Sequence, residues 1–423
     1  MSRRKRVLLS AFACEPYKGS EPEVGWQWAM QISRFHDVTV LTRKQYRAPV
    51  EKVLKALPGD RPKPEFIYFD LPDWAQRLGK GSVGLRTYYV FWQKKAHGLI
   101  DQLHRERPFD VMHHVTFATF RYPTAIWGHG VPSIWGPIGG IESTPSRLFP
   151  WEHPASLAVE VFRNLNNWIQ AAPFAKLPKR AAASTKTLVS TMEMQKALAK
   201  FGFASQLMPT IGLETEKLSH STHRQSEGPL RLLFVGKLIA LKGIDLALRA
   251  LASSGTTATL TLIGTGNYQA AAQRTAKCLG LGERVVFLGQ LPREKVLNIY
   301  GEFDVMLFPS LHDTGGFAVI EAMFNELPVI CLDCAGPAVA VPNDCGVKVS
   351  VQQNRQRVIE DLAAGIRRYD QDRQLLLSHG KAARQAILEN YDWEKKGNQM
   401  NEVYEEILNR TPGRPSTAEG YRA

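Results

Sequence analysis

The sequence contains no long apolar run of the kind that spans a membrane, and we do not expect its basic start to be a signal peptide. No stretch of its 423 residues approaches the ~20 consecutive apolar residues of a membrane-spanning helix. The basic start at residues 1–6 is followed by a short apolar run that ends in Cys14-Glu15-Pro16, without the small-residue cleavage site of a signal peptide. We therefore expect a buried first strand at residues 6–13 and a cytoplasmic location.

Metal-binding patterns are also sparse. The five cysteines are scattered, and Cys331 and Cys334 have redox or zinc spacing without a second CxxC or a histidine pair. Asp370 and Asp372 form a D-x-D triplet, a spacing known from metal sites, but no strand pattern precedes this polar, helix-like stretch. We expect reduced thiols in a core, solvated carboxylates at the triplet and no metal requirement.

Acidic residues do not balance the basic ones in the first half of the chain. Residues 1–212 hold 29 Lys and Arg against 16 Asp and Glu, whereas residues 213–423 hold 24 of each. The first half either faces an anionic partner, such as a phosphorylated acceptor or a membrane surface, or is generically basic. Helix-turn-helix, zinc-finger and RNP-type motifs are absent, so we expect no nucleic-acid partner.

Apolar runs alternate with helix-length segments throughout, which is typical of parallel α/β sheets. In the first half a helix is expected at residues 26–35, and strands are expected at residues 6–13, 37–42, 65–69, 110–115, 133–135 and 187–190. Residues 214–229 are polar and predict a linker. The later strands are expected at residues 230–235, 258–263, 285–288, 304–309 and 328–332, with helices at 243–252, 268–279, 292–301, 318–325 and 393–409.

This alternation predicts two doubly wound parallel-sheet domains, residues 1–212 and 213–392, followed by a disordered tail at residues 410–423. The strand carboxyl ends of both domains should face a central cleft, where ligands bind in such folds.

The clearest chemical pattern lies between residues 304 and 329. A strand is followed by a polar loop with Asp313, the adjacent Gly315 and Gly316, and a helix that opens near Phe317. Adjacent glycines and a helix N-terminus suit a phosphate, and Glu321 lies about one turn into the helix. A nucleotide sugar fits this arrangement; an Asp cap with a solvated Glu is the structural alternative.

The segment resembles the carboxylate-x7-carboxylate signature of glycosyltransferase family 4, whose members are retaining enzymes of the two-Rossmann GT-B fold. The usual form is Glu-Gly-Phe-Gly, four residues, then Glu-Ala; here Glu321-Ala322 matches the end, and Asp313 replaces the first Glu. The resemblance implies that Asp313 contacts the donor sugar, that Glu321 binds the ribose, and that Thr314 to Phe317 line the donor site.

Further resemblances lie upstream in the second domain. Gly236-Lys237, four residues, then Lys242-Gly243 is similar to the family element whose two cations neutralise the leaving diphosphate. Lys237 stands where Arg is common and lacks its bidentate fork. Four more residues are implied to border the nucleotide: Gly264, Gly266, Phe287 and Leu288.

The first half resembles the family's acceptor-side domain. Gly19 and Ser20 match a glycine loop near the donor phosphates, and Gly139 and Gly140 a loop on the acceptor side. His113 and His114 compete for the position of a histidine that faces the donor sugar; burial as structural histidines is the alternative. The helix at residues 393–409 resembles one that crosses back onto the first domain.

Together with the resemblance, these patterns predict a retaining, metal-independent hexosyltransferase without a cofactor. The expected reaction moves a sugar from a UDP-linked donor to a saccharide or lipid-linked saccharide acceptor, in cell-surface or extracellular polysaccharide or glycolipid synthesis. Aromatic stretches at residues 71–95 and 148–176 either contact the inner face of an anionic membrane or pack in the core. The alternatives are a GT-B sugar-nucleotide epimerase and a non-enzymatic basic scaffold that docks on membrane or nucleic acid.

Overall fold

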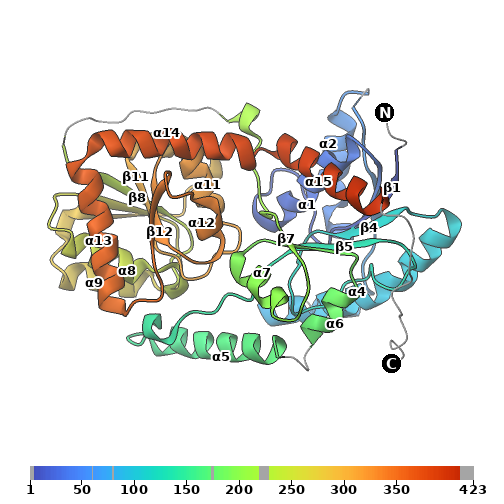
Figure 1. The fold of residues 1–423 in the computed structure, drawn as a ribbon, viewed down its shortest axis with the longest axis horizontal. Helices are drawn as coiled ribbons and strands as arrows, with labels where there is room; N and C mark the ends of the chain where they lie inside the picture. Colours follow the sequence, from blue (N-terminus) through green and yellow to red (C-terminus); the bar gives the residue numbers. More distant parts are fainter. Residues whose placement is uncertain (1–3, 60, 79–80, 173–175, 219–227, 410–423) are drawn as a thin grey trace.

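A seven-stranded parallel β-sheet forms the framework of the first half of the chain (Figure 1). The computed structural model describes residues 4–59, 61–78, 81–172, 176–218 and 228–409. The sheet order is β3-β2-β1-β4-β5-β6-β7. Its strands are β1 (Arg6–Ser10), β2 (Asp37–Thr42), β3 (Glu65–Tyr68), β4 (Val111–His114), β5 (Ser133–Ile138), β6 (Lys186–Val189) and β7 (Gln206–Leu207).

A six-stranded parallel sheet in the second half repeats this arrangement, with the order β10-β9-β8-β11-β12-β13. Its strands are β8 (Arg231–Val235), β9 (Thr259–Ile263), β10 (Val285–Gly289), β11 (Val305–Phe308), β12 (Val329–Leu332) and β13 (Gly346–Val349). In both sheets the first and fourth strands are neighbours, and the connections run outward from them in opposite directions. This is the doubly wound Rossmann-type order, so both halves have the predicted fold.

Helices cover both sheets, because parallel strands that are apolar along their whole length must be buried on both faces. All four residues of β4 and of β11 are buried, for example. The helices are α1 (Ser20–Ser33), α2 (Arg47–Ala56), α3 (Asp73–Leu78), α4 (Gly81–Glu106), α5 (Pro154–Gln170), α6 (Lys176–Ala182), α7 (Met192–Ala199), α8 (Ile244–Ser253), α9 (Gln269–Cys278), α10 (Arg293–Ile299), α11 (Phe317–Phe324), α12 (Ala335–Ala340), α13 (Arg355–Gln371), α14 (Arg373–Asn390) and α15 (Trp393–Asn409). Among the described residues, no helix is long and apolar enough to cross a bilayer.

The chain passes between the two sheets twice, and the two crossings pair with each other. Leu213 N donates to Tyr391 O at 2.7 Å, and Trp393 N donates to Leu213 O at 3.0 Å. The Thr215 hydroxyl adds a hydrogen bond to Asp392 at 2.6 Å. The predicted linker at residues 214–229 begins with this paired segment, and its residues 219–227 lie outside the described residues, as does the predicted tail at 410–423.

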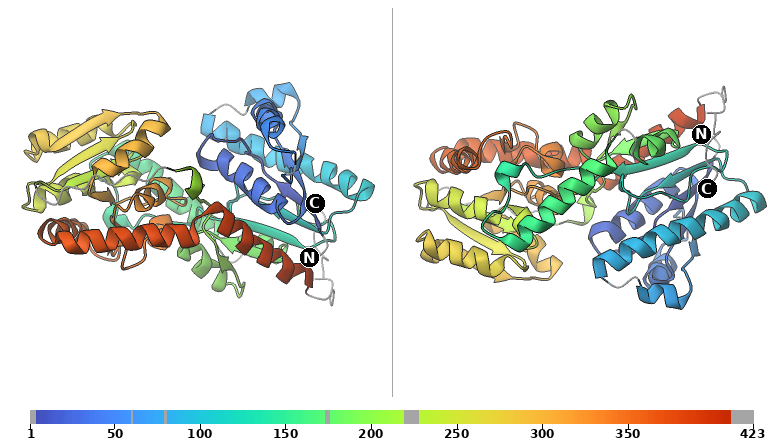
Figure 2. Two further views of the ribbon diagram at one scale, coloured as in Figure 1. Left: turned by 90° about the horizontal axis from the view of Figure 1, so that it is seen from above. Right: turned by 90° about the horizontal axis from the view of Figure 1, so that it is seen from below.

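After the second crossing, α15 packs on α1 of the first sheet, as the views in Figures 1 and 2 show. Trp28 and Trp393 meet edge to face with ring centroids 5.1 Å apart, and Arg34 pairs with Glu394 at 2.8 Å. Lys396 of the same helix is completely buried, and its amine donates to Pro209 O at 2.6 Å. The last described helix therefore joins the second half of the chain to the first.

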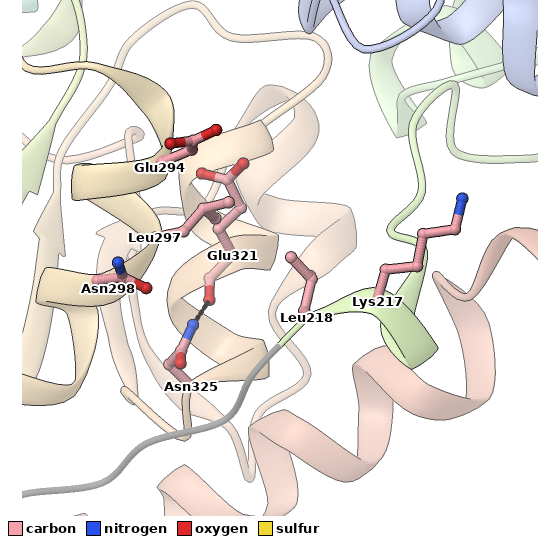
Figure 3. Close-up of a pocket in the computed structure, with 7 residues that line it drawn as sticks. All are labelled: Lys217, Leu218, Glu294, Leu297, Asn298, Glu321 and Asn325. Atoms are coloured by element: carbon pink, nitrogen blue, oxygen red, sulfur yellow. Dashed lines mark hydrogen bonds between the residues drawn. The ribbon is translucent and has the colours of Figure 1, made fainter. Parts of the chain in front are cut away.

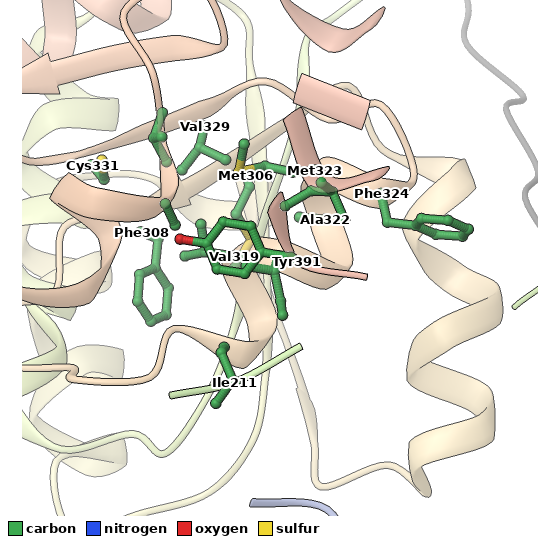
Figure 4. Close-up of a cluster of buried hydrophobic side chains, with 14 of the residues drawn as sticks. Ile211, Met306, Phe308, Val319, Ala322, Met323, Phe324, Val329, Cys331 and Tyr391 are labelled. Carbon is green, nitrogen blue, oxygen red and sulfur yellow. The ribbon is translucent and has the colours of Figure 1, made fainter. Parts of the chain in front are cut away.

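A continuous apolar core supports the loop that carries Asp313. Phe308 at the end of β11, Val319 and Met323 of α11, and Ile211 and Tyr391 of the two crossings belong to one buried cluster (Figure 4). Because strand, helix and crossings share this core, the loop between β11 and α11 has a rigid base.

Three details differ from the predictions. Helix α1 begins at Ser20 rather than at residue 26, since Pro22 is tolerated in a first helical turn and Glu21 and Glu23 suit a helix N-terminus. The short strand β7 and the strand β13 were not predicted. The thiols are free, but Cys278 is exposed rather than in a core.

Candidate functional site

The candidate site lies at the switch point of the second sheet. Strands β8 and β11 are neighbours whose following connections diverge, and this divergence opens a crevice at their carboxyl ends. The loop after β8 carries Lys237 and Lys242, and the loop after β11 carries Asp313 and the glycines. The fold therefore brings together the two motifs that the sequence places some 70 residues apart.

Lys242 and Asp313 are in direct contact. The Lys242 amine donates to Asp313 Oδ2 in an ion pair, and it lies 5.4 Å from the centroid of the Phe308 ring. The other carboxylate oxygen, Oδ1, accepts from Gly316 N at 2.8 Å. Asp313 is thus held from both sides, by the cation and by the backbone at the start of α11.

The backbone at Gly243 makes this contact geometrically possible. Gly243 adopts φ = 68°, and a Cβ at this position would lie 1.9 Å from Pro309 O. Any larger residue would be strained and would push the β8 loop away from the β11 loop. Glycine here therefore positions Lys242 beside Asp313.

Glu321 lies on α11 and is almost completely buried, with 7% of its surface exposed. Tyr300 OH donates to Oε2 at 3.0 Å, and Arg293 donates to Oε1 at 3.3 Å. Burial raises the pKa of Glu321, and the charge of Arg293 and the hydrogen bond from Tyr300 partly offset this rise. Two specific donors therefore hold a buried carboxyl group in a fixed orientation.

Arg293 links this carboxylate to the other half of the chain. Its guanidinium also donates to Glu23 of α1 at 2.8 Å, and Glu23 accepts from Gly19 N at 2.8 Å. The glycine loop predicted to approach the donor thus reaches Glu321 through one arginine. Sequence reasoning missed Arg293, because nothing in its local context at the start of α10 distinguishes it from a surface residue.

The remaining predicted nucleotide-side residues lie on adjoining strand ends. Gly236 N donates to Ile263 O at 2.9 Å, and Gly264 N donates to Gly289 O at 2.7 Å, so the ends of β8, β9 and β10 are bonded side by side. Gly266 packs against the Leu238 carbonyl. Lys237 is exposed and forms no ion pair within the described residues, whereas Phe287 and Leu288 belong to the edge strand β10.

The glycines predicted on the acceptor side meet the loop that carries Asp313 directly. A Cβ on Gly139 would lie 2.4 Å from Thr314 Cγ2, so the β5 loop of the first half touches the loop that carries Asp313. Gly140 O accepts a hydrogen bond from Arg121. Gly315 contacts Ile211, and Phe317 is the first residue of α11. The two halves therefore converge at Thr314.

Neither His113 nor His114 faces the cleft, contrary to the expectation for one of them. Both are at most 1% exposed on the central strand β4. His113 bonds to Tyr404 OH and to Gly136 O, both at 2.7 Å, and His114 bonds to Tyr89 OH at 2.9 Å and to Ser10 Oγ at 3.1 Å. Burial lowers the pKa of His113 to about 4 and that of His114 to about 3, so both imidazoles are neutral structural groups.

Metal-type ligands do not gather at this site within the described residues. One group with ligand-type atoms within 4.8 Å of one another comprises His97, Asp101 and His129. His97 and Asp101 lie on α4, which precedes β4, and His129 precedes β5. The group therefore does not include the loops that carry Lys242 and Asp313. At the D-x-D triplet, Asp372 caps α14 by accepting from Leu375 N at 2.8 Å, and Asp370 pairs with Arg373.

A pocket of about 300 Å³ adjoins Glu321 (Figure 3). Its walls come from α10, α11 and the first crossing between the halves, with Lys217 on the wall opposite the two helices. The volume is at the lower end of the range for small-molecule sites, which suits one portion of a larger ligand.

The fold and the position of this site define a class of protein. The structure aligns with sucrose-phosphate synthase of Thermosynechococcus elongatus with a TM-score of 0.63 and 18% identity, covering 96% of this chain and 99% of that one. The fold is therefore GT-B, as the sequence predicts: two Rossmann-like parallel-sheet domains.

Sequence comparison finds a family model that matches part of the chain. Residues 216–386 match the model described as glycosyl transferases group 1. Glycogen synthase of Mycobacterium tuberculosis is 27% identical over 207 residues, 48% of this chain and 49% of that protein. Sulfoquinovosyl transferase SQD2 of Arabidopsis thaliana is 31% identical over 169 residues, 40% of this chain and 32% of that protein. The chain thus spans half or less of the length of these relatives.

Proposed function

We propose that this protein transfers a sugar from a nucleotide-sugar donor to a hydroxyl acceptor. The observation that carries the proposal is the Lys242–Asp313 ion pair at the start of α11, with Glu321 on the same helix. The match of residues 216–386 to the model of glycosyl transferases group 1 supports it. One relative's name gives glycogen as the product and another's gives sulfoquinovosyl as the group transferred, so the family match supports sugar transfer rather than a particular substrate.

Each part of a nucleotide sugar finds a matching group in this arrangement. The diphosphate would lie at the N-terminus of α11, where free backbone N–H groups and Lys242 stabilise the negative charge that develops on departure. Glu321 would accept from the ribose hydroxyls. Asp313 would orient the sugar, because its carboxylate is already fixed by Lys242 and Gly316.

We further propose that the reaction proceeds with retention and without a metal ion. Asp313, the carboxylate nearest the expected sugar position, is engaged by Lys242 and Gly316 N and is poorly placed to act as a covalent nucleophile. A same-face mechanism, in which the leaving phosphate helps to deprotonate the acceptor, needs no such nucleophile. The lysine cations would take the role of a metal at the diphosphate.

A thermal-shift screen of UDP-, GDP- and ADP-linked sugars tests the donor. A UDP-sugar is the expected stabiliser, and its transfer product should keep the anomeric configuration in NMR spectra, with the rate unchanged by EDTA. Free epimerised sugar nucleotide without a transfer product would instead indicate an epimerase. Absence of nucleotide binding would leave the basic scaffold as the function.

We also propose that α5 contacts the inner face of an anionic membrane, which suits a lipid-linked acceptor in polysaccharide or glycolipid synthesis. The helix is apolar on its outer side and polar on its inner side: Glu160 and Asn167 are buried, whereas Phe162 and Trp168 are 72% and 70% exposed. The exposed face also includes Val159, Val161, Leu165, Ile169 and, just before the helix, Trp151.

The charge of the surrounding half of the chain favours an anionic surface as the partner. Glu160 points to the inner side of α5, where it pairs with Arg163. Its carboxylate therefore does not add negative charge to the exposed apolar face. The exposed Lys176 and Lys179 follow in α6, within the half that holds the whole excess of positive charge. Basic residues next to an apolar helix face are typical of helices that lie in a membrane interface.

Vesicle flotation tests the membrane contact. The protein should float with vesicles that contain phosphatidylglycerol and much less with pure phosphatidylcholine. A double variant, Phe162→Asp with Trp168→Asp, should abolish flotation, whereas Leu377→Asp on the exposed side of α14 should not. Equal flotation of both variants would contradict the assignment.

A further inference from the structure

Two buried polar atoms face each other across the junction of the two halves. Glu142 Oε2, from the loop after β5, lies 3.9 Å from His312 Nδ1, which immediately precedes Asp313. Neither atom has a hydrogen-bond partner among the described residues. The other oxygen of Glu142 accepts from the Thr191 hydroxyl at 2.7 Å, which fixes the carboxylate in place.

Such a pair needs an explanation, because burial without a partner is costly. Glu142 is only 3% exposed, and an unsatisfied buried polar group costs about 1–3 kcal/mol, more if it is charged. Folded proteins leave few groups in this state, and those that remain often bind something. At 3.9 Å the two atoms are too far apart to bond to each other.

The surrounding charges select the kind of group that fits between them. Burial lowers the pKa of His312 to about 3, and the nearby charges of Arg163, Arg121 and Lys242 lower it further, so the imidazole is neutral. A cation would be repelled by these residues, and an anion would be repelled by Glu142. A neutral group that can both donate and accept satisfies both atoms at once, and a hydroxyl is such a group.

The distance also suits a hydroxyl. An oxygen at the usual ~2.8 Å from both atoms would make an angle of roughly 90° between its two bonds, which a hydroxyl tolerates. The position is equally suitable, since Glu142 follows Gly139 and Gly140, and Gly139 touches Thr314 of the donor-side loop. The unpaired atoms therefore lie where sugar substrates would meet.

We propose that Glu142 and His312 together bind one hydroxyl of a sugar substrate, which donates to Glu142 Oε2 and accepts from His312 Nδ1. The proposal rests on the proposed transferase function and makes the pair a positioning and specificity element of the same site. Because each half of the chain supplies one partner, the hydroxyl is held only when the two halves are together. Because both histidines of β4 are buried, Glu142 is the residue by which the first half of the chain would contact the sugar.

The test compares Glu142→Gln and His312→Leu with the wild-type chain in two arms. The donor arm measures the affinities for UDP-glucose and for UDP by calorimetry. If the thermal-shift screen selects another nucleotide sugar, that sugar and its free nucleotide are used instead. The acceptor arm measures transfer to methyl β-D-glucoside and methyl β-D-galactoside at saturating donor. Asp304→Asn is the matched control, because Asp304 is a buried carboxylate at the amino edge of β11.

Removal of either partner should weaken the affected step about tenfold, because the substrate hydroxyl or the remaining buried group then lacks a hydrogen bond. If the hydroxyl belongs to the donor, both variants lose affinity for the nucleotide sugar and keep their affinity for the free nucleotide. If it belongs to the acceptor, both raise the acceptor KM and leave donor affinity unchanged. The Asp304→Asn control should change neither quantity.

Two kinds of failure are distinguishable. If the wild-type chain binds no nucleotide, the proposed function itself is wrong. If the wild-type chain binds and transfers, but both variants keep every affinity and KM within twofold, the hydroxyl site is overturned. A lowered melting temperature in both variants without any change in KM would likewise overturn it and make the pair a contact between the two halves alone.

Discussion

Glu321→Gln should weaken the binding of UDP about tenfold to a hundredfold. The carboxylate is 7% exposed and is oriented by Tyr300 and Arg293, so it is ready to accept hydrogen bonds from a ribose. Hydrogen bonds to a charged group contribute about 1.5–3 kcal/mol, and each 1.4 kcal/mol corresponds to a factor of about ten. Glutamine keeps the size and one acceptor oxygen, so the loss reports the charge and the second acceptor rather than a cavity.

Isothermal titration with UDP at pH 7.5 measures this effect, with the melting temperature as a check on folding. Glu294→Gln is the matched control, because Glu294 lines the same pocket but is exposed on α10. The control removes the same charge from the same region and should change the affinity less than twofold. An unchanged Kd for Glu321→Gln, or an equal loss in the control, would refute the assignment of Glu321 to the ribose.

Three further outcomes are expected. Lys242→Ala should lower the affinity for UDP at least tenfold and leave the affinity for uridine unchanged, since uridine has no diphosphate to neutralise; equal losses by calorimetry would contradict this role. Burial lowers the pKa of Lys396 to about 7 from an unfolded value of 10.5, so between these values the unfolded chain holds a proton that the folded chain has lost. The free energy of unfolding should therefore rise with pH from 7 to 9.5 by about 1 kcal/mol per unit relative to Lys396→Met, and equal slopes in urea titrations would exclude it. Trp28→Ala removes a fully buried ring that packs on Trp393 and should cost about 3–5 kcal/mol of stability in urea unfolding; a loss below 1 kcal/mol would mean that α15 is not held there.

Local patterns predicted most of the architecture. Uniformly apolar runs such as residues 110–115 and 304–309 are typical of strands buried on both faces, and the structure has strands at both places. Strands β7 and β13 were not predicted for a physical reason. β7 has only two residues, and each of the two strands is at an edge of its sheet, where pairing with one neighbouring strand defines it.

The loop after β11 was the easiest part of the site to predict, because its characteristic residues follow one another directly in the sequence. A glycine pair, a carboxylate and a helix start within ten residues predict an anion-binding turn without knowledge of any distant residue. Lys242 was singled out separately, because its segment resembles the family element that carries two cations. The direct contact of Lys242 with Asp313, however, depends on how β8 and β11 lie next to each other in the sheet.

The sequence by itself therefore determined two parallel α/β domains and the turn with Asp313 and Glu321, because side-chain periodicity and turn chemistry are local properties. Only the tertiary structure decided which polar groups are buried with partners and which come together at the candidate site. It buried His113 and His114 among partners on β4, brought Arg293 between Glu23 and Glu321, and set Glu142 opposite His312. Each of these outcomes depends on residues that are far apart in the chain, and burial and pairing of this kind arise only when the elements pack.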